Sequence, residues 1–231
     1  MLWTQKPVDA RLAAFTVKNG HELDGILLPY DVTGTRAHLV ALEKAGILSP
    51  AEALQINGAL DEILQRHSQG AFAIKQSQED SHTAIEEYVT QQLGPVGEKM
   101  HAGRSRNDQS LTALRLYAKA QLAQTKAAAL ALKQTLAQKA AQNNHPMPGY
   151  THMQKAMPFS TGAWLDAFAQ SLHDDATCLD AAIALNDQSP LGSGAGYGSG
   201  FVLDRKAEAN TLGFSRVQEN PLYCQNSRGK I

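Results

Sequence analysis

Residues 108–143 read DQSLTALRLYAKAQLAQTKAAALALKQTLAQKAAQN, and they form the longest regular pattern in the sequence. Apolar side chains recur along it about every 3.6 residues, the period of an α-helix. One face consists of Leu111, Leu114, Ala118, Leu122, Thr125, Ala129, Leu132, Leu136 and Ala140, and a second of Leu116, Ala120, Ala123, Ala127 and Leu130. A helix with two apolar faces packs against neighbours on both sides. We therefore predict one long helix in a bundle that continues across a subunit interface, in preference to a solvated coiled coil, whose period is 3.5.

Directly upstream, residues 99–109 read KMHAGRSRNDQ and concentrate positive charge and hydrogen-bond donors at the start of this helix. An arginine side chain presents a planar fork that fits a carboxylate, and the free amides of a helix N-terminus attract anions. Each residue alone also has a structural explanation, because Asn107 is a plausible N-cap and Arg104 and Arg106 are plausible solvated loop charges. The whole string favours a site for a small anion.

Downstream, residues 145–150 end the helix, because two prolines and Gly149 do not continue it. Thr151-His152-Met153-Gln154 follows, and a second long helix is predicted after Pro158, with Ser160 as its cap. Its apolar face consists of Leu165, Phe168, Leu172, Ala176, Leu179 and Ile183. The two helices are predicted to form an antiparallel pair. His152 in the polar link is the candidate for proton transfer, because imidazole groups titrate near neutral pH, and a structural histidine is the alternative.

Nearer the N-terminus, the sequence predicts an arm up to about Tyr30 and then shorter helices. Asp31 is a plausible N-cap for a helix that ends before Gly46, where a C′ glycine belongs. Residues 49–52, Ser-Pro-Ala-Glu, form a capping box. A further helix is predicted over residues 78–93, with Gly-Pro directly after it as its stop.

The glycine-rich stretch Ser189–Phe201 matches neither GxGxxG in register nor GxxxxGK[ST], so it is interpreted as a tight connection between packed helices. β-Branched residues in alternating runs are scarce throughout, and no sheet is predicted. The predicted fold class is all-α.

The composition of the chain argues against several classes of function. In 231 residues, Lys+Arg number 21 against Asp+Glu 22, which argues against a nucleic-acid surface or a polybasic membrane contact. The two cysteines, Cys178 and Cys224, form no CxxC pair, which fits a reducing cytoplasm. No signal-peptide core, bilayer-spanning run, metal-ligand cluster or cofactor fingerprint is recognisable, so we expect a cytoplasmic protein without metal or cofactor.

Four stretches occur in the order typical of one family: EDSHTAIE at 79–86, HAGRSRNDQ at 101–109, PGYTHMQ at 148–154 and PLGSGA at 190–195. Together they resemble the argininosuccinate lyases of the fumarase/aspartase superfamily. The resemblance implies a small helical N-terminal domain over residues 1–106 and the first long helices of a central bundle over 107–231. It also implies a homotetramer, because members of the family assemble their active sites from several subunits.

The implied reaction splits argininosuccinate into arginine and fumarate by acid–base β-elimination, which needs an acid, a base and fixed donors around carboxylates. His152, with Thr151, matches the catalytic pair, as general acid or as an aid to the base. The matching substrate-binding positions are Ser105, Arg106, Asn107, Gln154, Arg104, His82, Asp80 and Thr83. Taken alone, His82 reads as a cap-region histidine.

The chain departs from the family pattern in two respects. The loop that carries the family's serine base, a Gly-Ser-Ser stretch running into Met-Pro-x-Lys-Lys-Asn, does not occur in these residues, and Lys18-Asn19-Gly20 stands where many members have a substrate-binding serine. We therefore expect the N-terminal half of a lyase that does not complete an active site alone. The alternatives are a sister lyase acting on adenylosuccinate, aspartate or malate, and a non-catalytic helical scaffold or subunit partner.

Overall fold

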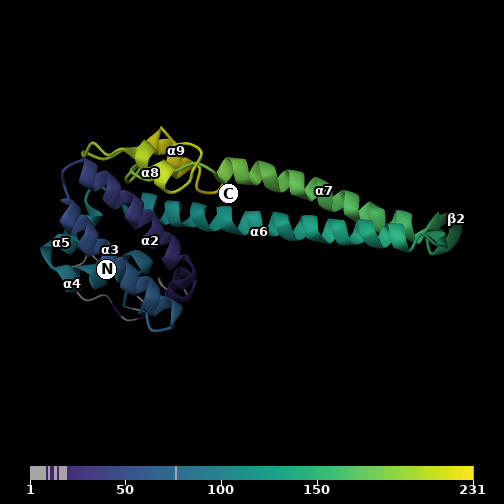
Figure 1. Ribbon diagram of the computed structural model, residues 1–231, viewed down its shortest axis with the longest axis horizontal. Coiled ribbons are helices and arrows are strands. Elements are labelled where there is room, and N and C mark those ends of the chain that lie inside the picture. The colour runs from purple at the N-terminus through teal and green to yellow at the C-terminus, as the bar shows by residue number, and fades with distance from the viewer. Residues whose placement is uncertain (1–8, 10, 13–14, 16–19, 76, 231) are drawn as a thin grey trace. The chain divides into compact units, whose positions relative to one another are not determined.

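The computed structural model describes residues 9, 11–12, 15, 20–75 and 77–230, and most of this part of the chain is helical (Figure 1). The elements are α2 (Gly20–Lys44), α3 (Pro50–Ser68), α4 (Ser81–Leu93), α5 (Pro95–Glu98), the 3₁₀ turn η1 (Lys99–His101), α6 (Arg106–Gln142), β1 (Pro146–Thr151), β2 (Gln154–Ser160), α7 (Thr161–Asn186), α8 (Arg205–Thr211) and α9 (Pro221–Asn226). The predicted all-α class is confirmed. Within the described ranges, every helix is too short or too polar to cross a bilayer.

The chain divides into two compact units. The first comprises Met1–Tyr117 and Asp187–Ile231, and the second comprises Ala118–Asn186. Helix α6 begins in the first unit and continues into the second. The domain boundary predicted between residues 106 and 107 coincides with the start of α6 and stays a prediction.

The core of the first unit lies where α2, α3 and α4 pack together. Leu28, Leu42, Ile56, Leu60 and Val89 are fully buried there. Burying side chains of this size stabilises the unit by about 1.5–3 kcal/mol each. Packing of this kind supplies most of the stability of helices in proteins.

The predicted start of α2 at Asp31 was wrong. The helix begins at Gly20 and runs through Pro29, so that Asp31 lies inside it and is 2% exposed. Leu28 and Val32 on either side of the proline are both buried, and this burial outweighs the loss of one amide donor. The predicted arm lies partly outside the described residues, as do Lys18 and Asn19. The predicted end is confirmed, because α2 stops at Lys44 and Gly46 has a φ of +70°.

The caps of α3 and α4 are made by neighbouring side chains. The capping box at α3 is confirmed, since the Glu52 amide donates to Ser49 Oγ at 3.3 Å and the Ser49 amide donates to Glu52 Oε2 at 2.9 Å. Helix α4 begins at Ser81, three residues later than predicted, because Asp80 is its N-cap and accepts from the Thr83 amide at 2.9 Å.

Two loops meet at the start of α6. The residue before the helix is Ser105, and its amide donates to Asp108 Oδ1 at 2.9 Å. Asn107, the alternative N-cap, lies inside the helix. The other Asp108 oxygen accepts from the amide of Gly194 at 3.1 Å, which fixes the glycine-rich stretch against α6. Gly194 has a φ of +60°, and a Cβ there would lie 2.6 Å from the Gly198 carbonyl oxygen. The predicted tight connection is therefore confirmed.

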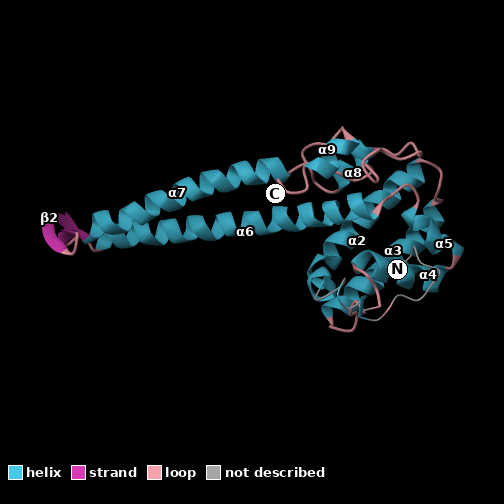
Figure 2. Cartoon of the chain, turned by 180° about the vertical axis from the view of Figure 1, so that it is seen from behind, coloured by secondary structure: helices cyan, strands magenta, loops and turns pink. Residues whose placement is uncertain are grey.

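In the second unit, α6 and α7 run antiparallel and side by side, as predicted (Figures 1 and 2). An ion pair joins them, between Lys126 Nζ and Asp180 Oδ1 at 2.6 Å. Ser160 caps α7, because its Oγ accepts from the Ala163 amide at 3.1 Å.

The link between these helices is an antiparallel hairpin of β1 and β2, so the prediction that no sheet forms was wrong. The strands pair from Pro146 with Ser160 to Thr151 with Gln154, around a two-residue turn at His152 and Met153. Prolines on both strands exclude helix, and the short ladder forms without the β-branched alternation by which strands are recognised.

Candidate active site

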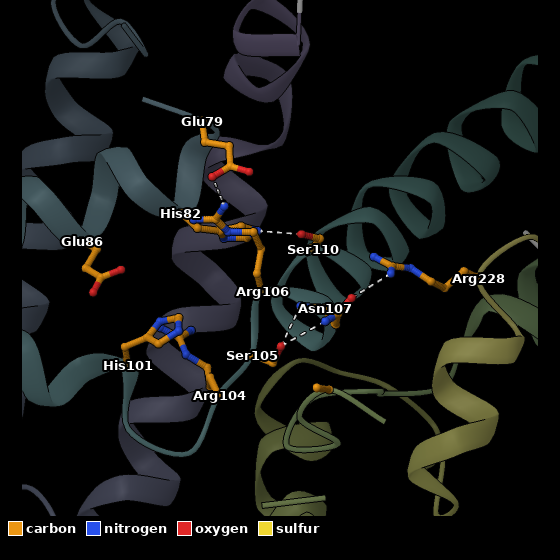
Figure 3. Close-up of a pocket in the computed structure, with 11 residues that line it drawn as sticks. Glu79, His82, Glu86, His101, Arg104, Ser105, Arg106, Asn107, Ser110 and Arg228 are labelled. Atoms are coloured by element: carbon orange, nitrogen blue, oxygen red, sulfur yellow. Dashed lines mark hydrogen bonds and ion pairs between the residues drawn. The ribbon is translucent and has the colours of Figure 1, made fainter. Parts of the chain in front are cut away.

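A pocket of about 690 Å³ opens in the first unit, at the start of α6 (Figure 3). The residues that line it are Glu79, His82, Glu86, His101, Arg104, Ser105, Arg106, Asn107, Ser110, Ala195 and Arg228. Three arginines therefore face two glutamates. Burial raises the pKa of the Glu86 carboxyl above its ordinary value. A cavity with this balance of charges favours an anionic ligand.

The predicted anion site is brought together here. Arg104, Ser105, Arg106 and Asn107 all line the pocket, and His82 of α4 lies on the same wall. Asp80 and Thr83 do not line it.

Arg106 is held by three contacts on its guanidinium group. Nη1 pairs with Glu79 Oε2 at 2.6 Å, Nε pairs with Asp80 Oδ2 at 3.0 Å, and Nη2 donates to Thr83 Oγ1 at 2.9 Å. A fork fixed in this way loses little conformational entropy when a ligand binds. In this structure Asp80 and Thr83 orient Arg106 rather than face the cavity themselves.

Arg104 and His101 contribute different kinds of donor. Arg104 donates from Nη1 to Thr35 Oγ1 at 3.0 Å and from Nη2 to the Met100 carbonyl oxygen at 3.4 Å. Burial lowers the pKa of Arg104, but an arginine stays charged at neutral pH. Burial and the nearby Arg104 charge lower the pKa of His101 to about 4, so His101 offers a neutral imidazole to the pocket.

His82 joins the pocket to the buried side of α2. Its Nδ1 forms an ion pair with Asp31 Oδ2, and its Nε2 lies 3.0 Å from Ser110 Oγ. Burial lowers the pKa of His82, but the Asp31 carboxylate outweighs this and leaves the pKa above its ordinary value. In turn, burial raises the pKa of Asp31, while His82 and Arg104 lower it to a net value below its ordinary one. His82 is therefore half of a buried ion pair rather than only a cap-region histidine.

A second buried pair supports the loop that carries Arg104. His38 Nε2 lies 2.8 Å from the carbonyl oxygen of Ala102, and Nδ1 lies 2.8 Å from Glu208 Oε1. A carbonyl only accepts, so Nε2 carries the proton and the Nδ1 of the neutral ring accepts. Glu208 must then be the protonated donor, and burial does raise its pKa to about 7, while burial lowers the pKa of His38 to about 3.

Glu208→Gln tests this protonation state, because the amide keeps a donor for His38 and does not titrate. The folded pKa of about 7 lies above the ordinary 4.5, so the wild-type carboxyl favours folding below pH 4.5, and this contribution is lost as the pH rises to 7. We expect the wild-type chain to lose roughly 3 kcal/mol of unfolding free energy relative to Glu208→Gln over this range.

Urea unfolding at about pH 5 and about pH 8 measures the difference. The exposed Glu43→Gln is the matched control and is expected to differ from wild type equally at both pH values. A Glu208→Gln difference that does not change with pH would show that Glu208 is ionised in the folded chain.

The remaining predicted residues lie in the second unit. Thr151 and Gln154 are the last pair of the hairpin ladder, and His152 and Met153 form its turn; all four are exposed, and none lines the pocket. His152 has a φ of +51° and Met153 a φ of +62°. A turn with two positive φ angles favours Asn-Gly, and other residues are strained there by about 1–2 kcal/mol each. Such strain is often found at functional sites, which supports His152 as a site residue.

Several pocket residues were not among the predicted ones. Glu79, Glu86 and His101 lie inside the motifs quoted above, so the sequence did contain a signal for them. Ser110 follows directly after one motif. Arg228 follows α9, and its Nη1 donates to Asn107 Oδ1 at 3.0 Å across 121 positions of sequence; no motif marks it.

Comparisons with known proteins identify the family of the chain. A family model described as Lyase matches residues 4–228. Argininosuccinate lyase of Thermotoga neapolitana is 42% identical over 97% of this chain and 56% of that protein, and argininosuccinate lyase of Bacteroides fragilis is 40% identical over 100% and 52%. A solved variant of EDDS lyase with bound fumarate aligns with a TM-score of 0.79 at 27% identity, over 95% of this chain and 44% of that one. The chain spans about half the length of the curated relatives it matches.

Proposed function

Because the chain belongs to the lyase family whose model matches residues 4–228, we propose that it supplies part of an active site that splits argininosuccinate into arginine and fumarate. Curated relatives at about 40% identity are argininosuccinate lyases, which favours this substrate over those of the sister lyases. The chain spans about half of each relative, so the proposal concerns an assembly with the remaining part.

The observation that carries the proposal is the pocket with three arginines and a fixed Arg106 fork. Proton removal next to a carboxylate places extra negative charge on the substrate, and guanidinium groups held in place stabilise that charge. Ser105 and Asn107 add hydrogen-bonding groups at the same helix start. The neutral His101 adds a donor or acceptor that brings no charge of its own.

In the proposed division of roles, the pocket binds the substrate and the hairpin handles protons. His152, beside Thr151, exchanges a proton as general acid or as an aid to the base, and Gln154 contacts the substrate. The proposed assembly is the homotetramer that the family resemblance implies. Exposed Leu132, Trp164 and Phe168 on α6 and α7 provide apolar area for such an assembly.

The same exposed side chains favour a second candidate function, a helical scaffold without catalysis. Both candidates fit the proposed cytoplasmic location, where the free Cys178 and Cys224 would remain reduced. Turnover of argininosuccinate distinguishes them.

Fumarate formation, followed by its ultraviolet absorbance, tests the proposed function. We expect no turnover by the chain alone, and turnover once it is joined to the C-terminal half of the Thermotoga neapolitana relative. Arg106→Ala in the joined protein is expected to lower kcat/KM about 100-fold, because it removes the cation and leaves Glu79 and Asp80 unpaired beside the substrate.

Arg36→Ala is the matched control, since Arg36 also pairs with a carboxylate, Asp61, but does not line the pocket. Wild-type kcat/KM in Arg106→Ala would contradict the role of the pocket. If the joined protein did not cleave argininosuccinate but formed fumarate from another substrate, the proposed substrate would be wrong and the proposed lyase class would be correct. If the joined, folded protein formed fumarate from neither argininosuccinate nor adenylosuccinate, aspartate or malate, the scaffold function would be favoured.

A further inference from the structure

Ser110 lies in the second turn of α6 with its side chain on the pocket wall (Figure 3). Its hydroxyl makes one hydrogen bond within the described part of the chain, to His82 Nε2 at 3.0 Å. A serine hydroxyl has one hydrogen to donate and two lone pairs that accept. The direction of the bond to His82 therefore decides whether that hydrogen points at the histidine or remains available to a ligand.

The Asp31 carboxylate, which faces His82 Nδ1, determines whether that nitrogen is protonated. Asp31 Oδ2 pairs with Nδ1 and also accepts from Ser81 Oγ at 3.1 Å. Asp31 is 2% exposed, and an ionised carboxylate only accepts. His82 Nδ1 therefore carries a hydrogen.

The charges around His82 determine whether its Nε2 is protonated as well. The acidic groups that face it are Asp24 and Asp31 from α2 and Asp80 at the N-cap of α4; Arg104 and His101 face it from the loop before α6. Because His101 is neutral at pH 7, three carboxyl groups and only one cationic group, the Arg104 guanidinium, face His82. This surplus favours the imidazolium form, in which Nε2 also carries a hydrogen and donates to Ser110 Oγ.

We propose that Ser110 is a substrate-binding residue whose hydroxyl donates a hydrogen bond to a carboxylate in the pocket, and that Asp31 and His82 are positioning residues that set its direction. The identity of the ligand rests on the proposed function. Because the hydroxyl accepts a hydrogen bond from His82 Nε2, its own hydrogen remains available to a ligand, and a carboxylate oxygen accepts it. Arg106 and Arg228 line the same cavity and supply the balancing charge.

Two measurements on the full chain test the proposal, with fumarate as the probe. The ¹⁵N chemical shifts of the His82 ring at neutral pH report whether one or both nitrogens are protonated; we expect both. Calorimetric titration with fumarate is expected to show about tenfold weaker binding for Ser110→Ala, equivalent to about 1.4 kcal/mol. Ser110→Thr, which keeps the hydroxyl, is expected to bind within about twofold of wild type. Thr125→Ala, which removes an exposed hydroxyl elsewhere on α6, serves as the control.

The outcomes are distinguishable. If His82 Nε2 is unprotonated, the proposed direction of its hydrogen bond to Ser110 is wrong, regardless of the fumarate affinities. Equal affinity of wild type and Ser110→Ala overturns the role of Ser110 alone. A wild-type protein that binds no fumarate, either alone or joined to the C-terminal half, overturns both the ligand role of Ser110 and the proposed use of this pocket.

Discussion

Replacing His152 with alanine is expected to lower fumarate formation by the joined protein about 1000-fold, while leaving the hairpin folded. Positioned proton donors and acceptors typically contribute about 10²–10⁴ to a rate, and the elimination needs both a proton acceptor and a proton donor. His152 is exposed at the tip of the hairpin, so its side chain does not support the second unit. The loss should therefore appear in kcat, with thermal stability close to that of the wild type.

Two further variants separate the imidazole from the turn geometry. His152→Gly accepts the φ of +51° without strain and removes the imidazole, so it is expected to lose as much activity as His152→Ala. His173→Ala removes an exposed histidine from α7 of the same unit and is expected to keep wild-type activity. If His152→Gly remained active while His152→Ala did not, the turn conformation rather than the imidazole would be what the reaction needs.

Asp31→Asn is expected to have the largest effect on stability, a loss of about 3–5 kcal/mol of unfolding free energy near pH 6. The substitution leaves His82 as a buried cation without its carboxylate, and burial then lowers the pKa of His82. Urea unfolding measures the loss, and Asp61→Asn is the matched control, because Asp61 pairs with Arg36 at the exposed surface. That variant should lose less than about 1 kcal/mol.

The pH dependence of the difference identifies the ion pair. The pKa of Asp31 lies below its ordinary 3.8, so its contribution is present above pH 3.8 and is lost as the pH falls through the folded value. The pKa of His82 lies above its ordinary 6.5, so its contribution is complete below pH 6.5 and is lost as the pH rises through the folded value. The gap between wild type and Asp31→Asn should therefore be widest between about pH 4 and pH 6.5. A gap that stayed equally wide below about pH 4 and well above pH 6.5 would mean that Asp31 acts by packing alone.

A double variant completes this test. Asp31→Asn combined with His82→Gln removes both charges, and we expect it to be more stable than Asp31→Asn alone, since no unpaired buried charge remains. If the two losses simply added, the two side chains would not be coupled.

The helical class and several helix ends were predictable from the sequence alone. The capping box at Ser49, the C′ glycine at Gly46 and the Gly94-Pro95 stop were recognisable because each acts on amides or carbonyls within a few residues along the chain. The cluster from Arg104 to Asn107 was recognisable for the same reason, since its residues are consecutive and all belong to one pocket wall.

Local sequence signals gave wrong predictions where packing or backbone pairing outweighed them. Asp31 has the sequence context of an N-cap, but burial of the residues on either side of Pro29 extends the helix past it. The hairpin at His152 depends on backbone pairing and on two strained turn residues, and its side chains do not resemble a strand.

Which polar side chains meet across long stretches of sequence follows only from the packing of the chain. Asp31 pairs with His82, His38 with Glu208 across 170 positions, and Asn107 with Arg228 across 121 positions. Burial gives two of these contacts their strength, because Asp31, His82, His38 and Glu208 are removed from water only after α2, α4 and α8 have packed. Burial shifts the pKa values of His38 and Glu208, whereas the ion pair between Asp31 and His82 outweighs burial and shifts theirs. The charge of the pocket is therefore a property of the packed chain rather than of its composition.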